Sequence, residues 1–237
     1  MIKIFSTSPL LNNYETIFND MKSQFDTLNE RNFPIKYVFW GREDQLSKID
    51  SSNIDIDLIK ENNFRLYETP GMVALYDYAI QEKDAKYYVF FHAKGGGAIK
   101  HGKDLKRDER QLHVDKFFEI INNIESYDLL NSGKSFDVIG YQVNKLGPPY
   151  VEETRFHIVP NFWIAKVSHI KSLVRPTREN ITKDVGFLIE KGRVSRGIGH
   201  HSEDVWRYGC ENWIGYLEDT VIYSTKDSKY FCARDIK

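Results

Sequence analysis

The chain has 237 residues, of which 41% are hydrophobic and 14% aromatic, so it is long and apolar enough to bury a globular core. A formal net charge of −1 argues against general nucleic-acid binding, which needs a strongly basic surface. The two cysteines, Cys210 and Cys232, are too few for a disulfide scaffold. The sequence shows neither the pattern of a signal peptide nor an apolar run of ~20 residues. We therefore expect a cytoplasmic protein without a transmembrane segment.

The first part of the sequence alternates predicted strands and helices. Strands are expected at Ile2–Phe5, at "IKYVFWG" (35–41), at "NFRLYETPG" (63–71, stopped by Pro70-Gly71) and at Tyr87–Phe91. Apolar residues at helical spacing predict amphipathic helices between Tyr14 and Leu28 and between Met72 and Ile80. This alternation is typical of an α/β fold with a mostly parallel central sheet flanked by helices.

The second part begins with a glycine-rich and then charged loop, Gly95–Arg110, followed by a long amphipathic helix from Val114 to Ile124. "SFDVIGYQV" predicts a strand, and "HIVPNFWIAKVSHIKSL" predicts a strand that runs into a helix. A loop rich in Gly, Arg and His, "EKGRVSRGIGHHSED", precedes the aromatic segment "VWRYGCENWIGYL". Because no internal repeat or linker interrupts the pattern, we expect one domain over residues 1–237.

The stretch "YYVFFHAKGGG" ends a buried strand in His92, Ala93 and Lys94 before three glycines. Parallel sheets bind ligands at the carboxyl ends of their strands, near a topological switch point. Lysine suits a phosphate as a point charge, and an imidazole N–H can donate to a phosphate oxygen. An anion site at this strand end is therefore one interpretation, and a surface lysine beside a structural histidine is the other.

The segment Gly97–Lys103 matches the G-x-x-x-x-G-K pattern of a phosphate-binding P-loop. The next residue is Asp104, where the pattern needs Ser or Thr for Mg²⁺, and its carboxylate would repel a β-phosphate. The sequence therefore favours a solvated loop here. A nucleotide-binding phosphotransferase stays as an alternative function.

Two further groups of residues have the chemistry of a site. One group has the residue types of a metal site: His200, His201, Glu203 and Asp204. It lacks the H-x-x-x-H spacing of a helix-borne zinc pair, so a charged loop is the simpler interpretation. In the other, Glu211 lies in an aromatic segment beside Trp213, where apolar surroundings would raise the pKa of a carboxyl group and make it a usable base. A structural acid satisfied by hydrogen bonds fits Glu211 equally well.

Four blocks of the chain, in order, resemble GT-A-fold glycosyltransferases of bacterial polysaccharide synthesis and some large DNA viruses. "IKIFSTS" is similar to a nucleotide-binding first strand, "MVALYDYAIQEKDAKYYVFFHAKG" to a helix followed by an "LHTKG" strand end, "HIVPNFWIAKVSHIKSL" to a "GNFWWA" block, and "ENWIGYL" to an E-x-W segment. Pro160 and Ala93 depart from the Gly and Thr of this pattern. The Asp-x-Asp that commonly holds Mn²⁺ or Mg²⁺ in GT-A enzymes is absent from the expected strand end, so the metal, if any, is unknown.

The resemblance implies a transfer of sugar from a nucleotide diphosphate sugar to a glycan hydroxyl. It implies nucleotide contacts from Ser6 and Thr7, ring stacking by Trp40 and ribose binding by Asp77. Lys94 and His92 would face the diphosphate, and Asn161 and Trp163 would shape the sugar and acceptor site, although periodicity alone makes them core residues. Glu211 is the implied base, with Asp204 as its competitor. A non-catalytic carbohydrate-binding module that uses the same aromatic residues is a second alternative.

Overall fold

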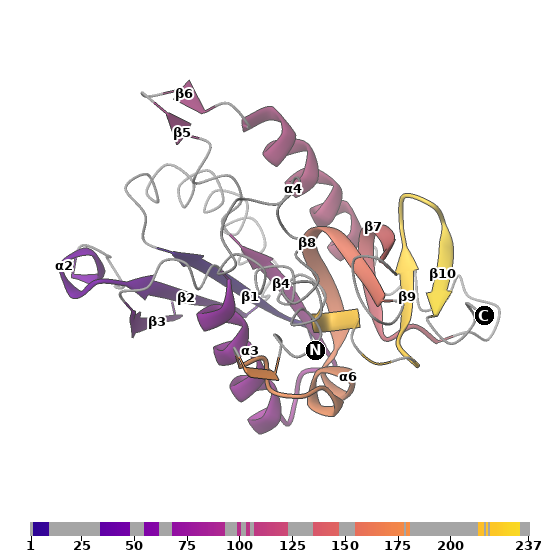
Figure 1. The fold of residues 1–237 in the computed structure, drawn as a ribbon, viewed down its shortest axis with the longest axis horizontal. Coiled ribbons are helices and arrows are strands. Elements are labelled where there is room, and N and C mark those ends of the chain that lie inside the picture. Colours follow the sequence, from indigo (N-terminus) through magenta and orange to yellow (C-terminus); the bar gives the residue numbers. More distant parts are fainter. Residues whose placement is uncertain are drawn as a thin grey trace, which may run out of the picture.

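The computed structural model describes residues 2–9, 34–47, 55–61, 68–92, 99–100, 103–104, 107–122, 135–146, 155–177, 179–180, 213–215, 217 and 219–232. Its main feature is an eight-stranded sheet with the order β10-β9-β7-β8-β4-β1-β2-β3 (Figure 1). The strands are β1 (Ile2–Pro9), β2 (Ile35–Gly41), β3 (Asp55–Lys60), β4 (Tyr87–His92), β7 (Val138–Leu146), β8 (Arg155–Lys166), β9 (Val221–Ser224) and β10 (Lys229–Cys232).

The sheet is mixed and mostly parallel, which places the chain in the α/β class. Strands β8 and β10 run opposite to the other strands of this sheet. From β1 the chain continues outward to β2 and β3, and then returns to place β4 on the other side of β1. The order therefore reverses between β1 and β4, and a reversal of this kind is the topological switch point at which open α/β sheets bind ligands.

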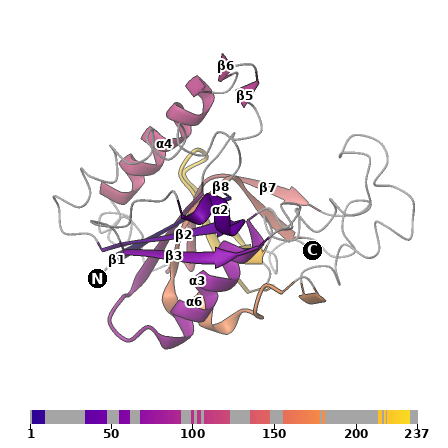
Figure 2. The same ribbon diagram turned by 90° about the vertical axis from the view of Figure 1, so that its left-hand side faces the viewer.

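Helices cover both faces of the sheet (Figures 1 and 2). On one face, α3 (Thr69–Gln81) and α6 (Val167–Ser172) pack against Phe90 and Trp163 through Met72 and Ile170. On the opposite face, the helix α4 (Arg107–Asn122) contributes Ile120 and Ile121 to a second core with Phe91 and Phe162. Successive strand residues alternate between the two cores, as expected from a side-chain period of two.

Several predicted elements are confirmed. The strand over 35–41 is β2, and the buried run before His92 is β4, in which each residue is buried. The predicted helix between Met72 and Ile80 is α3, and the block 157–173 is β8 followed by α6. The first strand extends to Pro9 rather than Phe5, β7 is displaced toward the C-terminus, and α4 begins inside the predicted loop. The predicted helix at 14–28 and the loop at 190–204 lie outside the described residues.

The predicted strand at 63–71 is wrong at its C-terminal end. Glu68 is the N-cap of α3, and Pro70 and Gly71 belong to its first turn. Proline is well tolerated there, because the first N–H groups of a helix have no partner within it and φ is already helical. The strand that pairs with β2 is instead β3, at Asp55–Lys60.

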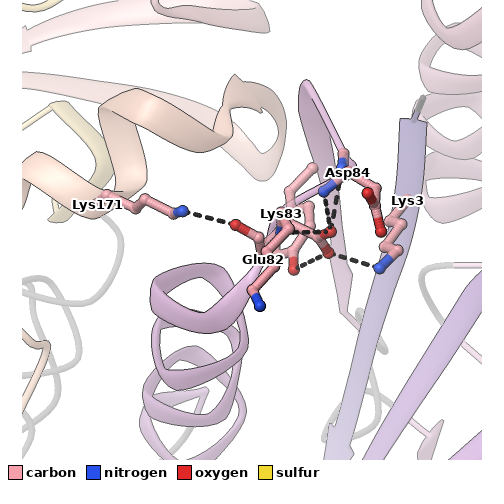
Figure 3. A network of polar contacts seen from close by, with 7 residues as sticks. Lys3, Glu82, Lys83, Asp84 and Lys171 are labelled. Atoms are coloured by element: carbon pink, nitrogen blue, oxygen red, sulfur yellow. Dashed lines mark hydrogen bonds and ion pairs between the residues drawn. The ribbon is translucent and has the colours of Figure 1, made fainter.

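The amino ends of β1 and β4 are tied to the C-terminus of α3 by Glu82 (Figure 3). Its carboxylate accepts hydrogen bonds from Lys3 Nζ at 2.6 Å, from the Tyr88 hydroxyl at 2.8 Å and from the backbone N–H groups of residues 83–85 at 2.9–3.1 Å. Its main-chain oxygen accepts from Lys171 Nζ at 2.7 Å. Burial alone would raise the pKa of Glu82, but these donors lower it from 4.5 to about 2.

At its N-terminus, α3 packs tightly against β1, through Gly71 and Thr7. A Cβ built on Gly71 would lie 2.0 Å from Thr7 Oγ1 and 2.4 Å from Thr7 Cβ. Both distances are far below van der Waals contact, and Thr7 is itself buried in the sheet. Glycine at 71 therefore allows the N-terminus of α3 to approach the carboxyl end of β1.

We expect Gly71→Ala to lower the free energy of unfolding by about 1–3 kcal/mol, because overpacking of this size forces the helix or strand to move. The better helix propensity of alanine, at most about 1 kcal/mol, offsets only part of this loss. Urea denaturation measures the change. Adding Thr7→Gly to Gly71→Ala should recover part of the loss, and strictly additive losses in the double variant would contradict a steric cause.

Candidate functional site

The carboxyl ends of β1 and β4 bring two polar residues together at the switch point. Thr7 and His92 are partners in the parallel β1–β4 register, and both are buried. The chain continues from β4 into the segment that holds Lys94, which lies outside the described residues. The structure therefore places His92, but not Lys94, at the expected strand end.

Glu68, at the start of α3, lies beside His92. Its Oε1 lies 3.3 Å from Nδ1 of His92, and the exposed fractions of the two side chains are 11% and 6%. As the N-cap, Glu68 lies at the positive end of the dipole of a 13-residue helix, which favours an ionised carboxylate. Its side chain makes no capping hydrogen bond. A buried acid and a buried histidine therefore form a pair at the switch point.

Aromatic residues on two strands hold the His92 ring. The ring is nearly parallel to that of Phe90, with centroids 6.0 Å apart, and it meets Phe162 edge-on at 5.0 Å. Phe90 is itself stacked on Trp163 at 4.9 Å. These contacts restrict rotation of the imidazole, so the nitrogen that faces Glu68 is set by the packing.

Asn161 lies in β8 on the same side as Trp163, which pairs with Phe90 of β4, so continuing this antiparallel register places Asn161 opposite His92. On its other side, β8 is irregular. Gly140 of β7 pairs with Trp163, but Gln142 pairs with Val159, so Tyr141 alone faces residues 160–162. A bulge disrupts the regular ladder, which suits Pro160 because proline has no N–H to donate, and bulges often redirect side chains next to sites. The Trp163 indole N–H donates to Asn161 Oδ1 at 3.1 Å. The amide nitrogen of Asn161 is thereby left as the group that can donate to a ligand.

Four buried polar residues thus form what we call the switch-point cluster: Thr7, Glu68, His92 and Asn161. Within the described part of the chain, Thr7 Oγ1 and Asn161 Nδ2 are buried and have no hydrogen-bond partner. A buried polar group without a partner costs free energy, so such groups mark a place where a ligand oxygen would be stabilised. The cluster can offer a ligand a hydroxyl, an amide N–H and an imidazole nitrogen.

The other sequence-predicted residues take different positions. Ser6 is buried one residue before Thr7, so strand alternation directs it toward the α4 face rather than toward α3. Trp40 is fully buried at the end of β2, two residues after Val38, which packs on the α3 face. Trp163 is also fully buried and stacks in the core. Trp163 is not a member of the cluster but orients Asn161 by donating its indole N–H to the amide oxygen. Stacking on a ligand by Trp40 stays a prediction.

Asp77 lies on α3, eight residues after its first residue, or about 12 Å along the helix axis. Its carboxylate makes a bidentate ion pair with Arg175, whose Nε and Nη2 donate to Oδ1 and Oδ2 at 2.7 and 2.6 Å. The side chains are 44% and 46% exposed. The pair joins α3 to the segment that follows α6, and ribose binding by Asp77 stays a prediction.

The E-x-W segment is anchored on the α3 and α6 side through the short helix η5 (Trp213–Gly215). The Trp213 indole N–H donates to the carbonyl of Val174 at 2.8 Å, and the ring meets Tyr76 edge-on. His169 Nε2 lies 2.8 Å from the Ile214 carbonyl, and burial lowers the His169 pKa, so the ring is neutral and donates from Nε2. Glu211, two residues before Trp213, lies outside the described residues, as does Asp204.

The described residues of the P-loop candidate, 99–100 and 103, belong to strands. Ile99–Lys100 (β5) and Lys103–Asp104 (β6) form an antiparallel pair, with Lys100 opposite Lys103. The next helix, α4, begins only at Arg107. In a P-loop the Gly-Lys pair opens the helix whose N-terminus receives the phosphate. Among the residues described here, Lys103 instead belongs to a strand, and the helix starts four residues later.

No group of three or more His, Cys, Asp or Glu residues that could hold a metal ion occurs within the described ranges. The acidic residues Glu203 and Asp204 lie outside these ranges. Among the helices that the structure describes, none is long and apolar enough to cross a membrane.

Glu68 is the residue of the cluster that the sequence did not predict. Pro70-Gly71 is typical of a strand end, and that pattern predicts a strand that includes Glu68. An acidic residue directly before Thr-Pro at the start of a periodic apolar run is also a helix N-terminal signal, and that signal would have placed Glu68 at a strand–helix junction.

No protein-family model matches the chain, and no curated protein matches it significantly.

Proposed function

We propose that the protein is a GT-A-like glycosyltransferase that moves a sugar from a nucleotide diphosphate sugar to a glycan hydroxyl. The observation that carries this proposal is the switch-point cluster at the carboxyl ends of β1 and β4. Ligands of open α/β sheets bind in this position. The cluster unites three of the four sequence blocks that resemble these enzymes: the first strand, the α3–β4 block and the Asn-Phe-Trp block.

The chemistry assigns a role to each part of the site. In sugar transfer the bond between the anomeric carbon and the diphosphate breaks, the acceptor oxygen forms the new bond, and the acceptor proton goes to a base. Thr7 and Asn161 bind ligand oxygens at the switch point, and Lys94 offsets the charge of the leaving diphosphate. Glu211 takes the acceptor proton, carried by the segment that Trp213 anchors.

A bound Mn²⁺ or Mg²⁺ needs oxygen ligands, which His92 and Lys94 do not supply. His92 and Lys94 would therefore not hold such a cation at the strand end. A cation that takes part in the reaction would be held by acidic residues elsewhere, and Glu203 and Asp204 are the candidates.

We expect a nucleotide diphosphate to bind more tightly than the matching monophosphate, and Lys94→Ala to cost about 1.5–3 kcal/mol of diphosphate binding. A charge-assisted hydrogen bond of this strength corresponds to roughly a 10- to 150-fold loss of affinity. A thermal-shift panel of nucleotide diphosphates and their sugars selects the ligand, because binding to the folded state raises the melting temperature. Calorimetry then measures the affinity.

Lys103→Ala is the matched control, because Lys103 belongs to the strand β6, which pairs with β5. Equal affinities for the mono- and diphosphate would contradict the role of Lys94. Loss of ATP binding in Lys103→Ala but not in Lys94→Ala would favour the phosphotransferase. Sugar binding without nucleotide affinity would favour the carbohydrate-binding module.

A further inference from the structure

The pair formed by Glu68 and His92 determines which nitrogen of the imidazole carries the proton. Glu68 Oε1 lies 3.3 Å from His92 Nδ1, and both side chains are buried. An unprotonated Nδ1 would direct its lone pair at a carboxylate oxygen, and the two would repel. A proton on Nδ1 makes the contact attractive, so the carboxylate keeps a proton there, and burial of the ring disfavours the charged form with a second proton on Nε2.

Two features show that Glu68 is placed for this contact. The start of α3 favours its ionised form, as the positive end of the helix dipole. The carboxylate makes no capping hydrogen bond with α3, so its position beside His92 is not a by-product of capping. On the other side of the pair, Phe90 and Phe162 hold the imidazole.

We infer that Glu68 is a positioning residue that keeps the proton of His92 on Nδ1 and leaves Nε2 as the acceptor nitrogen. An acceptor nitrogen cannot bind a diphosphate oxygen, which is itself only an acceptor. His92 therefore binds a hydroxyl group of the ligand, on its ribose or its sugar, and the diphosphate is left to other donors. This changes the donor role that the sequence predicts for His92. The identity of the ligand rests on the proposed function, whereas the position of the proton does not.

His169 provides an internal comparison of the opposite kind. Its Nε2 lies 2.8 Å from the carbonyl oxygen of Ile214, which can only accept, so the proton is on Nε2. Both rings are buried. One protein thus contains two buried histidines whose surroundings select opposite tautomers.

Long-range ¹H–¹⁵N correlation spectra of the full chain with ¹⁵N-labelled histidine report the tautomer of each ring at pH 7. The variants His92→Gln and His169→Gln assign the two signals. In the wild type we expect a neutral His92 with its proton on Nδ1 and a neutral His169 with its proton on Nε2. A proton on His92 Nε2, alone or together with Nδ1, would overturn the inference in the wild type itself.

The variant Glu68→Ala tests the cause. We expect the proton of His92 to move toward Nε2, the form that free imidazole side chains prefer, while the His169 signal stays unchanged and reports an intact fold. A His92 tautomer that is the same in Glu68→Ala as in the wild type would rule out Glu68 as the positioning residue. The wild-type spectrum decides the inference even when this variant does not fold.

Uridine diphosphate and guanosine diphosphate, added in excess to the labelled wild-type protein, separate this inference from the proposed function. We expect His92 to stay neutral with its proton on Nδ1 when nucleotide is bound. A doubly protonated His92 in the complex would show that it donates to the diphosphate and would overturn its acceptor role. If neither nucleotide binds, the result counts against the glycosyltransferase. The tautomer of His92 in the unliganded protein would still decide the role of Glu68.

Discussion

Replacing Glu82 by Gln should lower the free energy of unfolding by roughly 2–4 kcal/mol. A buried carboxylate that loses its charge leaves Lys3 and the surrounding donors poorly satisfied, and such changes in fully buried pairs cost about 3–5 kcal/mol. The side chain of Glu82 is 5% exposed, but that of Lys3 is 36% exposed, so the loss should fall below the upper end of that range. Urea denaturation at pH 7 measures it.

The same variant should reveal a dependence on pH. The folded-state pKa of Glu82 is about 2, below the ordinary 4.5, so its ionised form stabilises the fold above pH 4.5. This stabilisation is lost as the pH falls from 4.5 toward 2, and the difference between the wild type and Glu82→Gln should shrink over that interval. A difference that stays constant from pH 6 to about pH 2.5 would contradict the shifted pKa.

Glu119→Gln is the matched control for Glu82→Gln. Glu119 also accepts from a lysine, Lys116, at 2.9 Å, but its side chain is 59% exposed. Exposed pairs contribute about 0–1 kcal/mol because water screens both charges. A loss in Glu119→Gln as large as that in Glu82→Gln would show that the burial of Glu82 is not the cause.

Replacing Glu211 by Gln should lower turnover by roughly 10²–10⁴, the usual contribution of a general base. The change keeps the size of the side chain and leaves the anchors of the neighbouring segment in place, since Trp213 and Ile214 make their hydrogen bonds to Val174 and His169 independently of residue 211. Fold and donor affinity should therefore be retained.

Turnover of Glu211→Gln is measured as release of nucleotide diphosphate from the sugar nucleotide that most raises the melting temperature. The control is Asp204→Asn, which removes the competing carboxylate. Turnover of Glu211→Gln within a few-fold of the wild type would exclude Glu211 as the base. A large loss in Asp204→Asn would then assign the role to Asp204.

The fold was predictable from the sequence where the signals are local. The apolar runs of β2 and β4 and the periodic face of α3 each contain their own pattern, and the structure confirms them. The strand predicted over 63–71 failed because Pro-Gly can end a strand or open a helix. The close approach of Gly71 to Thr7 suits the second choice, and no local pattern reveals that contact.

The candidate site was only partly predictable for the same reason. His92 could be placed because it directly ends a buried strand, and Thr7 because it ends another. The position of Asn161 near His92 depends on how β8 pairs with β4, and the Asp77–Arg175 ion pair joins residues 98 positions apart. Such features depend on contacts between residues far apart in the chain, and they produce no sequence pattern within a single helix or strand.

The strand order also has a consequence for synthesis on the ribosome. Each residue of β4 is buried in the finished sheet, yet its second edge is covered only by β8, which ends at Lys166. At about 5–20 residues per second, translation from His92 to Lys166 takes roughly 4–15 s. During that interval the apolar edge of "YYVFFH" lacks the strand that covers it in the completed sheet. The new chain therefore passes through a stage in which this fully buried strand is an exposed edge with which another chain can pair.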